Sequence, residues 1–434
     1  MIMNVRDRLN RLTGEAEKRE KTEIREEILT LRRRIDAIMA RKPRSSAYKC
    51  QNRYAVTRVL EDVIHGSEIC NDYGTFYVSR SVAEGSDSHG CRTISEIGGL
   101  NMNHAALLAA DERIARSDLE RGLFIDTETT GLSGGTGTTA FLIGLGWWEN
   151  GSFVTEQIFL RDFSEETAAL VFLRETAAKR EFLITFNGKA FDIGLLSTRF
   201  ILNRQRDPFI GLPHLDLLFP SRRLLGHRLE NSRLVTLEEQ ILDFRRRGDI
   251  PGYEIPGRYF DWLGRKDAAV LEDVFLHNRL DIISMAVLAV HLAELVDPAF
   301  CRDESNDADL IAASRLLIER GELDSAMIIL KATADKGCGR FSFEAKKILS
   351  LLYKRCGQWK RAVAMWEEMI DKNPGDFFAL TEMAKWCEHR ADELERATSL
   401  VKQALQYAEE SSELCKILVH RHNRLLRKLR RARQ

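Results

Sequence analysis

The sequence predicts an α/β domain built on a mixed central β-sheet, followed by an all-α region of helical repeats. Apolar runs of strand length cluster between residues 121 and 186, and helical segments alternate with the later ones. After Ser305 the pattern is helical throughout, with an internal repeat. The 434 residues suffice for two or three domains.

Composition and charge exclude several classes of protein. Lys+Arg and Asp+Glu both number 65, so the net charge is zero and any nucleic-acid contact must use local patches. The N-terminal MIMNVRDRLNRL lacks the apolar core of a signal peptide, and the apolar stretch 285–296 is too short to span a bilayer. The eight cysteines include no CxxC pair. We therefore expect a cytoplasmic protein without membrane contact.

The chain divides into four predicted segments. Residues 1–44 form a charged helical segment whose apolar stripe either binds a partner or packs on the same protein. Residues 45–117 form a small mixed region with strand-like runs and no evident chemistry. The α/β domain spans residues 118–297, and the helical repeats with a basic tail span 305–434.

The α/β segment has an ordered series of elements. Strands are predicted at 121–127, 138–148, 153–160 and 182–186, with Asn150-Gly151 as a hairpin turn between the second and third. Helices follow at about 164–180, opened by Ser164, at 189–203, up to about 245 and at 267–296, while 214–219 is a strand or a turn. This order is that of a ribonuclease-H-like sheet, since Rossmann and TIM folds need strict β-α alternation.

The C-terminal segment repeats with a period of about 35 residues. Ala326, Ala362 and Ala397 recur at equivalent positions, where a small side chain permits close helix approach. The middle unit resembles a tetratricopeptide repeat, an architecture that often binds a partner protein. The tail 416–434 carries eight Lys/Arg and no acid, so it either contacts phosphates or is a solvated end helix.

Four carboxylates lie at positions where packing alone would not favour a charged side chain. Asp126 and Glu128 point to one face at the end of a buried strand, Asp192 lies in the first turn of a helix, and Asp281 lies in an otherwise apolar helix. Brought together they would raise one another's pKa. Two divalent cations would neutralise them, and oxygen ligands favour Mg²⁺ or Mn²⁺ over zinc.

Such a cage suits hydrolysis at phosphorus by two metal ions. His277 precedes Asp281 by four residues, so on a helix both side chains share a face. His277 is therefore a candidate general base, although a buried, hydrogen-bonded histidine would give the same pattern. A haloacid-dehalogenase-type phosphatase is disfavoured because Glu128 occupies the place of its second aspartate.

Three motifs resemble those of the DnaQ-like (DEDD) 3′–5′ exonucleases: DTETTG at 126–131, NGKAFD at 187–192 and HNRLD at 277–281. The wider similarity, over about 118–296, is to the YprB-like ribonuclease-H-like branch. The resemblance implies that Asp126, Glu128, Asp192 and Asp281 bind two Mg²⁺ or Mn²⁺ ions and that His277 is the base. One departure is that His277 has the spacing to Asp281 that the family uses for tyrosine.

The residues that would contact a substrate have weaker signals in the sequence. Thr129, Thr130 and Gly131 open a glycine-rich loop that either lets a nucleotide approach the backbone or simply connects two strands; it lacks the lysine of a Walker loop. Asn187 belongs to the second motif, and Asp216 is interpreted as structural. The arginine-rich segment 221–247 either lines a nucleic-acid groove or forms a solvated face.

The favoured interpretation is a Mg²⁺- or Mn²⁺-dependent 3′–5′ exonuclease acting on DNA or RNA, with single-stranded ends preferred. Hydrolysis would release nucleoside monophosphates. Two alternatives remain: a nucleic-acid-binding protein with weak or no turnover, and a scaffold that recruits a protein partner through its helical repeats.

Overall fold

The structure is a computed structural model that describes residues 57–131, 137–300, 306–337, 339–408 and 413–432. The predicted N-terminal helix at 1–44 and most of the glycine loop at 131–137 lie outside these ranges. The described residues belong to one compact unit, Thr57–Gln434.

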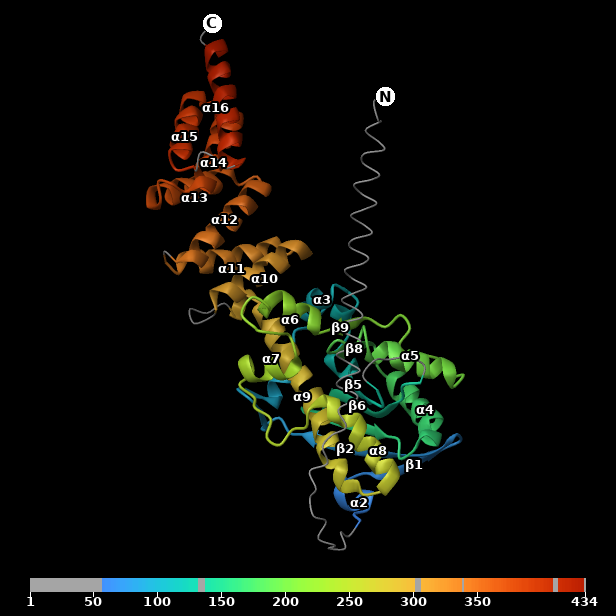
Figure 1. The fold of residues 1–434 in the computed structure, drawn as a ribbon. Coiled ribbons are helices and arrows are strands. Elements are labelled where there is room, and N and C mark those ends of the chain that lie inside the picture. The colour runs from blue at the N-terminus through green and yellow to red at the C-terminus, as the bar shows by residue number, and fades with distance from the viewer. Residues whose placement is uncertain (1–56, 132–136, 301–305, 338, 409–412, 433–434) are drawn as a thin grey trace, which may run out of the picture. The chain divides into compact units, whose positions relative to one another are not determined.

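A seven-stranded mixed sheet organises the α/β part (Figure 1). Its strands, in spatial order, are β1 (Ser67–Asn71), β2 (Gly74–Ala83), β7 (Ser152–Phe159), β6 (Ala140–Glu149), β5 (Gly122–Thr129), β8 (Phe182–Thr185) and β9 (His214–Asp216). The pairs β5–β8 and β8–β9 are parallel, and the other pairs are antiparallel. A separate short ladder joins β3 (Ser88–His89) to β4 (Arg92–Thr93).

The predicted strand order is confirmed from β5 onward. Asn150 and Gly151 both have positive φ, 50° and 84°, as the predicted hairpin turn requires. The ambiguous stretch 214–219 is a short strand that continues into a helix. Strands β1 and β2 come from the segment 45–117. Strand β2 pairs with β7 and β1 pairs with β2, so the sheet extends N-terminal of the boundary predicted at residue 118.

Helices cover both faces of this sheet. They are α2 (Leu60–Val63), α3 (Met102–Ala109), α4 (Glu166–Ala177), α5 (Asp192–Leu202), α6 (Leu218–Leu225), α7 (Leu234–Gln240), α8 (Ile255–Arg265) and α9 (Glu272–Leu295). Along β5, Leu123 and Ile125 pack toward α4 and α5, whereas Phe124 packs toward α9, which is the alternation expected of a strand. The prediction that Ser164 opens the first helix is wrong, because Asp162 caps this turn by accepting the Ser164 N–H.

Helix α9 lies unusually close to the sheet. Gly144 and Gly146 in β6 face it, and a Cβ on them would sit 2.3 Å from Asn278 Oδ1 and 2.4 Å from Ile282 Cγ2. Two glycines on one face of the strand therefore permit this approach. By length and composition the segment Ala268–Leu295 could cross a membrane, but 61% of its most apolar window is buried inside the protein.

The C-terminal region is helical, as predicted. Its helices are α10 (Asp307–Arg320), α11 (Leu323–Asp335), α12 (Arg340–Arg355), α13 (Trp359–Lys372), α14 (Phe377–Trp386), α15 (Leu394–Gln406) and α16 (Glu413–Ala432). Ala326, Ala362 and Ala397 are fully buried between neighbouring helices, which fits the packing role predicted for them. The tetratricopeptide identity of these helices stays a prediction. In the basic tail, Arg421, Arg424 and Lys428 all pair with Glu388, so part of its charge is already neutralised.

Candidate metal centre

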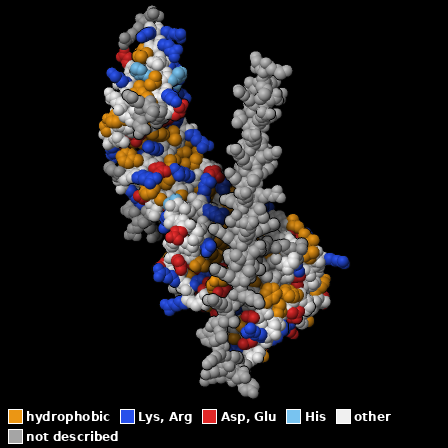
Figure 2. Space-filling model, in the orientation of Figure 1, with side chains coloured by type: hydrophobic (Ala, Val, Ile, Leu, Met, Phe, Trp, Pro, Cys, Tyr) orange, Lys and Arg blue, Asp and Glu red, His pale blue; other side chains and the backbone are white. Residues whose placement is uncertain are grey.

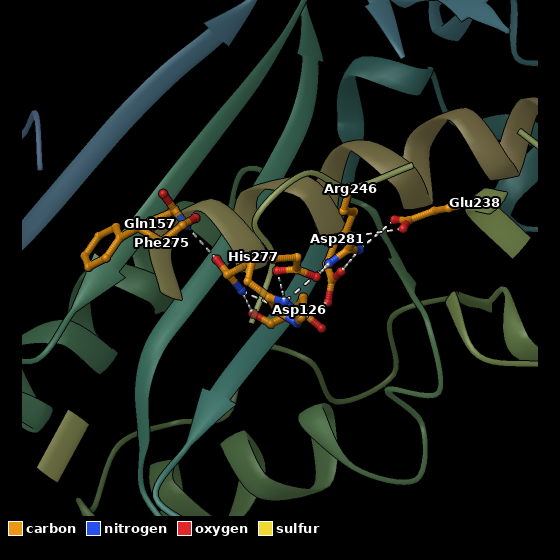
Figure 3. Close-up of polar contacts among 9 residues, drawn as sticks. Asp126, Gln157, Glu238, Arg246, Phe275, His277 and Asp281 are labelled. Atoms are coloured by element: carbon orange, nitrogen blue, oxygen red, sulfur yellow. Dashed lines mark hydrogen bonds and ion pairs between the residues drawn. The ribbon is translucent and has the colours of Figure 1, made fainter. Parts of the chain in front are cut away.

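The end of β5 and the middle of α9 meet at a cluster of acids (Figure 3). Glu128, His277 and Asp281 each offer a ligand atom, and these atoms lie within 4.8 Å of one another. Asp126 lies two residues before Glu128 on the same face of β5. Asp192 is the first residue of α5, as the sequence predicted. The structure thus brings the five predicted residues to one end of the sheet.

Neighbouring side chains hold two of the acids in place. The amide of Asn278 donates to Asp126 Oδ2 at 2.9 Å, and Gln157 Nε2 in turn donates to Asn278 Oδ1 at 2.9 Å. Thr127 Oγ1 donates to Asp192 Oδ1 at 2.5 Å. Sequence reasoning missed Asn278 and Gln157, although a polar residue inside an apolar helix or strand is a usable signal.

The second motif is shaped by Asp216. Its carboxylate accepts the backbone N–H groups of Asn187 at 2.7 Å and Lys189 at 3.0 Å, which lie just before Asp192. Asn187 adopts a φ of 66°, a conformation that the asparagine side chain tolerates better than most. The structural interpretation of Asp216 is confirmed. The substrate role of Asn187 stays a prediction.

Burial and, after it, mutual repulsion set the electrostatics of the cluster. Burial first, and then Asp281 and Asp192, raise the pKa of both Asp126 and Glu128 well above the ordinary range. Burial raises the pKa of Asp192 to about 6, against hydrogen bonds that lower it. The charged forms of these carboxyls are therefore disfavoured together, and a bound cation would relieve their repulsion.

One arginine enters this acidic cluster. Arg246, whose side chain is only 4% exposed, donates to both oxygens of the fully buried Glu238 at 2.7 and 2.6 Å and also pairs with Asp281. Burial alone would lower the pKa of Arg246, but Asp281 and Glu238 raise it. The arginine-rich segment was predicted to line a groove or a solvated face. For Arg246 that prediction is wrong, because its side chain turns inward.

His277 is oriented by a carboxylate that the sequence did not single out. Its Nδ1 lies 2.7 Å from Asp249 Oδ1, and its Nε2 lies 3.6 Å from Asp281 Oδ2. An imidazole that donates from Nδ1 to Asp249 keeps the lone pair of Nε2 directed toward the acids. The spacing of three intervening residues therefore still places the ring at the cluster.

The start of the glycine loop is ordered by local hydrogen bonds. Thr129 Oγ1 donates to the Gly131 carbonyl at 2.8 Å, and Thr130 pairs with Thr139 through two hydrogen bonds. The register of β5 against β6 shifts between Glu128 and Thr129. Contact of Thr129, Thr130 and Gly131 with a nucleotide stays a prediction.

The donor set fits divalent cations. Asp126, Glu128, Asp192 and Asp281 supply oxygens, and within the described residues the guanidinium of Arg246 is the one Lys or Arg group that forms an ion pair with any of them. An acidic surplus whose members raise one another's pKa is the electrostatic signature of a cation site. The residues present therefore suit Mg²⁺ or Mn²⁺. Arg246 would compete with a bound cation for the carboxylate of Asp281.

Comparison with known proteins agrees with this architecture. Residues 123–293 match the profile of the RNase H superfamily. The chain is also 33% identical over 294 residues to the protein YprB of Bacillus subtilis (strain 168), named an uncharacterized protein. That alignment covers 66% of this chain and 69% of YprB. The chain therefore belongs to the YprB family and carries a domain of the RNase H superfamily.

Proposed function

We propose that the protein is a metal-dependent nuclease, most specifically a 3′–5′ exonuclease of the DEDD type that hydrolyses single-stranded ends of DNA or RNA. The observation that carries this proposal is the convergence of Asp126, Glu128 and Asp281 with His277 at one end of the sheet. Membership of the RNase H superfamily supports nuclease chemistry in general.

The four carboxylates and His277 have distinct roles in this proposal. Asp126, Glu128, Asp192 and Asp281 would hold the two cations, which supply charge neutralisation at the phosphate and a more acidic water. His277 Nε2 accepts the proton of the attacking water, because Nδ1 is committed to Asp249. Asn278 keeps the Asp126 carboxylate from rotating away from the site.

The start of the glycine loop and the second motif supply the substrate contacts in this proposal. The chain at Thr129, Thr130 and Gly131 would approach the terminal nucleotide through groups other than the Thr130 N–H, which donates to the Thr139 carbonyl. Asn187 would contact the sugar or base. The C-terminal helices would serve as tetratricopeptide-like repeats that recruit a protein partner.

A cleavage assay tests the proposal. Purified protein with Mn²⁺ and 5′-labelled single-stranded DNA or RNA should produce a ladder that shortens from the 3′ end. Asp126→Asn and Asp281→Asn should lower the rate at least 100-fold, since removal of a catalytic electrostatic group costs that order. Asp371→Asn, at an exposed carboxylate of α13, is the matched control and should cleave normally. Wild-type protein that cuts neither substrate would refute the enzyme proposal.

A second candidate is a nucleic-acid-binding protein with weak turnover. The pairing of Arg246 with Asp281 favours it, because a guanidinium already occupies part of the predicted cage. The same assay separates the two: salt-dependent binding of the labelled strand without shortening would support the second candidate.

A further inference from the structure

A groove lined with arginines joins the α/β domain to the first helices of the repeat region. It has a volume of about 580 Å³ and lies between α6 and the helices α10 and α12. Its charged or titratable lining consists of Arg222, Arg223, His227, Arg315, Arg340 and Glu344. Both sides of the groove thus contribute cations.

A second hollow, of about 640 Å³, continues this groove along the helical face and shares three of its residues, Arg315, Arg340 and Glu344. It adds Lys347 and the rings of Phe343 and Phe378. The Lys347 ammonium lies 5.8 Å from the centroid of the Phe378 ring. Figure 2 shows Lys and Arg side chains interspersed with hydrophobic ones and some Asp and Glu over the C-terminal helices. Cations interleaved with aromatic rings are typical of surfaces that bind single-stranded nucleic acid.

The groove has more positive charge than its carboxylates neutralise. Arg223 pairs with Glu319, and Arg315 pairs with Glu344. Asp376, at the far end, accepts the Ala379 N–H and caps α14. Arg222 and Arg340 are exposed and form no ion pair with any carboxylate in the described part of the chain. They leave a surplus of positive charge that faces solvent.

Helix α6 connects this groove to the acidic cluster. The Leu218 N–H at its start donates to Asp216, the same carboxylate that holds the backbone of Asn187 and Lys189 next to Asp192. Phe219 is 54% exposed one turn before the arginines of α6. An extended strand that leaves the cluster along α6 would therefore meet an aromatic ring and then the arginines.

We propose that this groove binds the sugar-phosphate backbone of the single-stranded nucleic acid whose end occupies the carboxylate cluster. The proposal rests on the proposed function for the identity of the strand. In this arrangement the helical repeats extend the substrate-binding surface, and Arg222 and Arg340 contact phosphates. Long strands then bind more tightly than strands that fill the catalytic end alone.

The test is equilibrium binding of fluorescent single-stranded oligonucleotides to the full chain in EDTA, where no hydrolysis is required. The variant is Arg222→Glu/Arg340→Glu, which breaks no ion pair in the described structure. The matched control is Lys360→Glu/Lys402→Glu, which makes the same charge change at exposed positions of α13 and α15 outside the groove. Thermal melting of both variants confirms folding.

For long strands, the groove variant should bind at least about tenfold more weakly than wild type at low salt. The slope of log Kd against log salt should fall by about 1.4, since each phosphate contact of a single strand contributes about 0.7. The control variant should bind like wild type, and very short oligonucleotides should not distinguish the groove variant from the control.

Two results would overturn the proposal. If the groove and control variants bind long strands with equal affinity, the groove does not bind the strand and would suit another partner, such as an acidic protein. An equal loss of affinity for short and long oligonucleotides would indicate a general electrostatic effect of the charge change, and not contacts between the groove and the strand. Because binding is measured without cleavage, absence of nuclease activity would refute the proposed enzyme and leave this result interpretable.

Discussion

Replacement of Arg246 by methionine should destabilise the metal-free protein by about 3–5 kcal/mol. Arg246 is 4% exposed, and its guanidinium is the partner of Glu238, which is fully buried. Methionine fills much of the same volume but leaves Glu238 charged without a cation, or forces it to take up a proton. Removal of one member of a buried ion pair typically costs this amount.

The same substitution should strengthen metal binding. Without the guanidinium, Asp281 no longer shares an oxygen with Arg246 and is free for Mn²⁺. Mn²⁺ should therefore stabilise Arg246→Met more than wild type, as expected for a ligand that binds only the folded state. Urea unfolding in EDTA and in Mn²⁺, followed by tryptophan fluorescence, measures both effects.

A double variant serves as the control. Glu238→Leu/Arg246→Met replaces both members of the buried pair with apolar side chains, so much of the lost stability should return. The reasoning is refuted if Arg246→Met alone costs less than about 1 kcal/mol. It is also refuted if Mn²⁺ stabilises this variant less than wild type.

Three further predictions concern the same site. Gly144→Ala should push α9 away from the sheet, lower the free energy of unfolding by about 1–3 kcal/mol and remove most Mn²⁺-dependent cleavage. Gly194→Ala is the control, because its Cβ would meet open space, and it should leave both urea unfolding and cleavage unchanged. Asp249→Ala should lower the cleavage rate more than Asp249→Asn, because asparagine still accepts the proton on His277 Nδ1; equal rates would remove the positioning role. In EDTA, the Asp192 carboxyl should contribute a loss of stability of up to roughly 3 kcal/mol as the pH rises from about 4 to about 6, because its pKa is about 6 in the folded protein against an ordinary 3.8. Asp192→Asn, melted at the same pH values, should show a shallower slope than wild type, and the slope that remains belongs to Asp126 and Glu128, whose pKa values are raised as well; an unchanged slope would contradict this role of Asp192.

Local patterns in the sequence were enough to predict the strands β5 to β8 and the four acids. Asp126 and Glu128 were identified because strand geometry puts residues two apart on one face, and Asp281 because a carboxylate in an apolar helix needs a partner. These arguments use only neighbouring residues. They therefore worked for β5 and α9, where one periodic element positions the side chain.

Contacts between distant segments could not be predicted in this way. Arg246 and Asp249 lie in a stretch without helix or strand periodicity, so nothing in RRRGD distinguishes an inward arginine from its exposed neighbours. The pairing of β2 with β7 depends on a register between segments far apart in the chain, which the alternation within GTFYVSR does not specify. The close approach of α9 depends on Gly144 and Gly146, and only the structure shows that this helix faces them.

Anomalous diffraction from crystals soaked in Mn²⁺ tests the central claim most directly. The account predicts manganese bound by the carboxylates of Asp126, Glu128, Asp192 and Asp281, with the Arg246 guanidinium displaced from Asp281. Full Mn²⁺ occupancy elsewhere on the protein, with Arg246 still paired to Asp281 and no manganese among these acids, would contradict it.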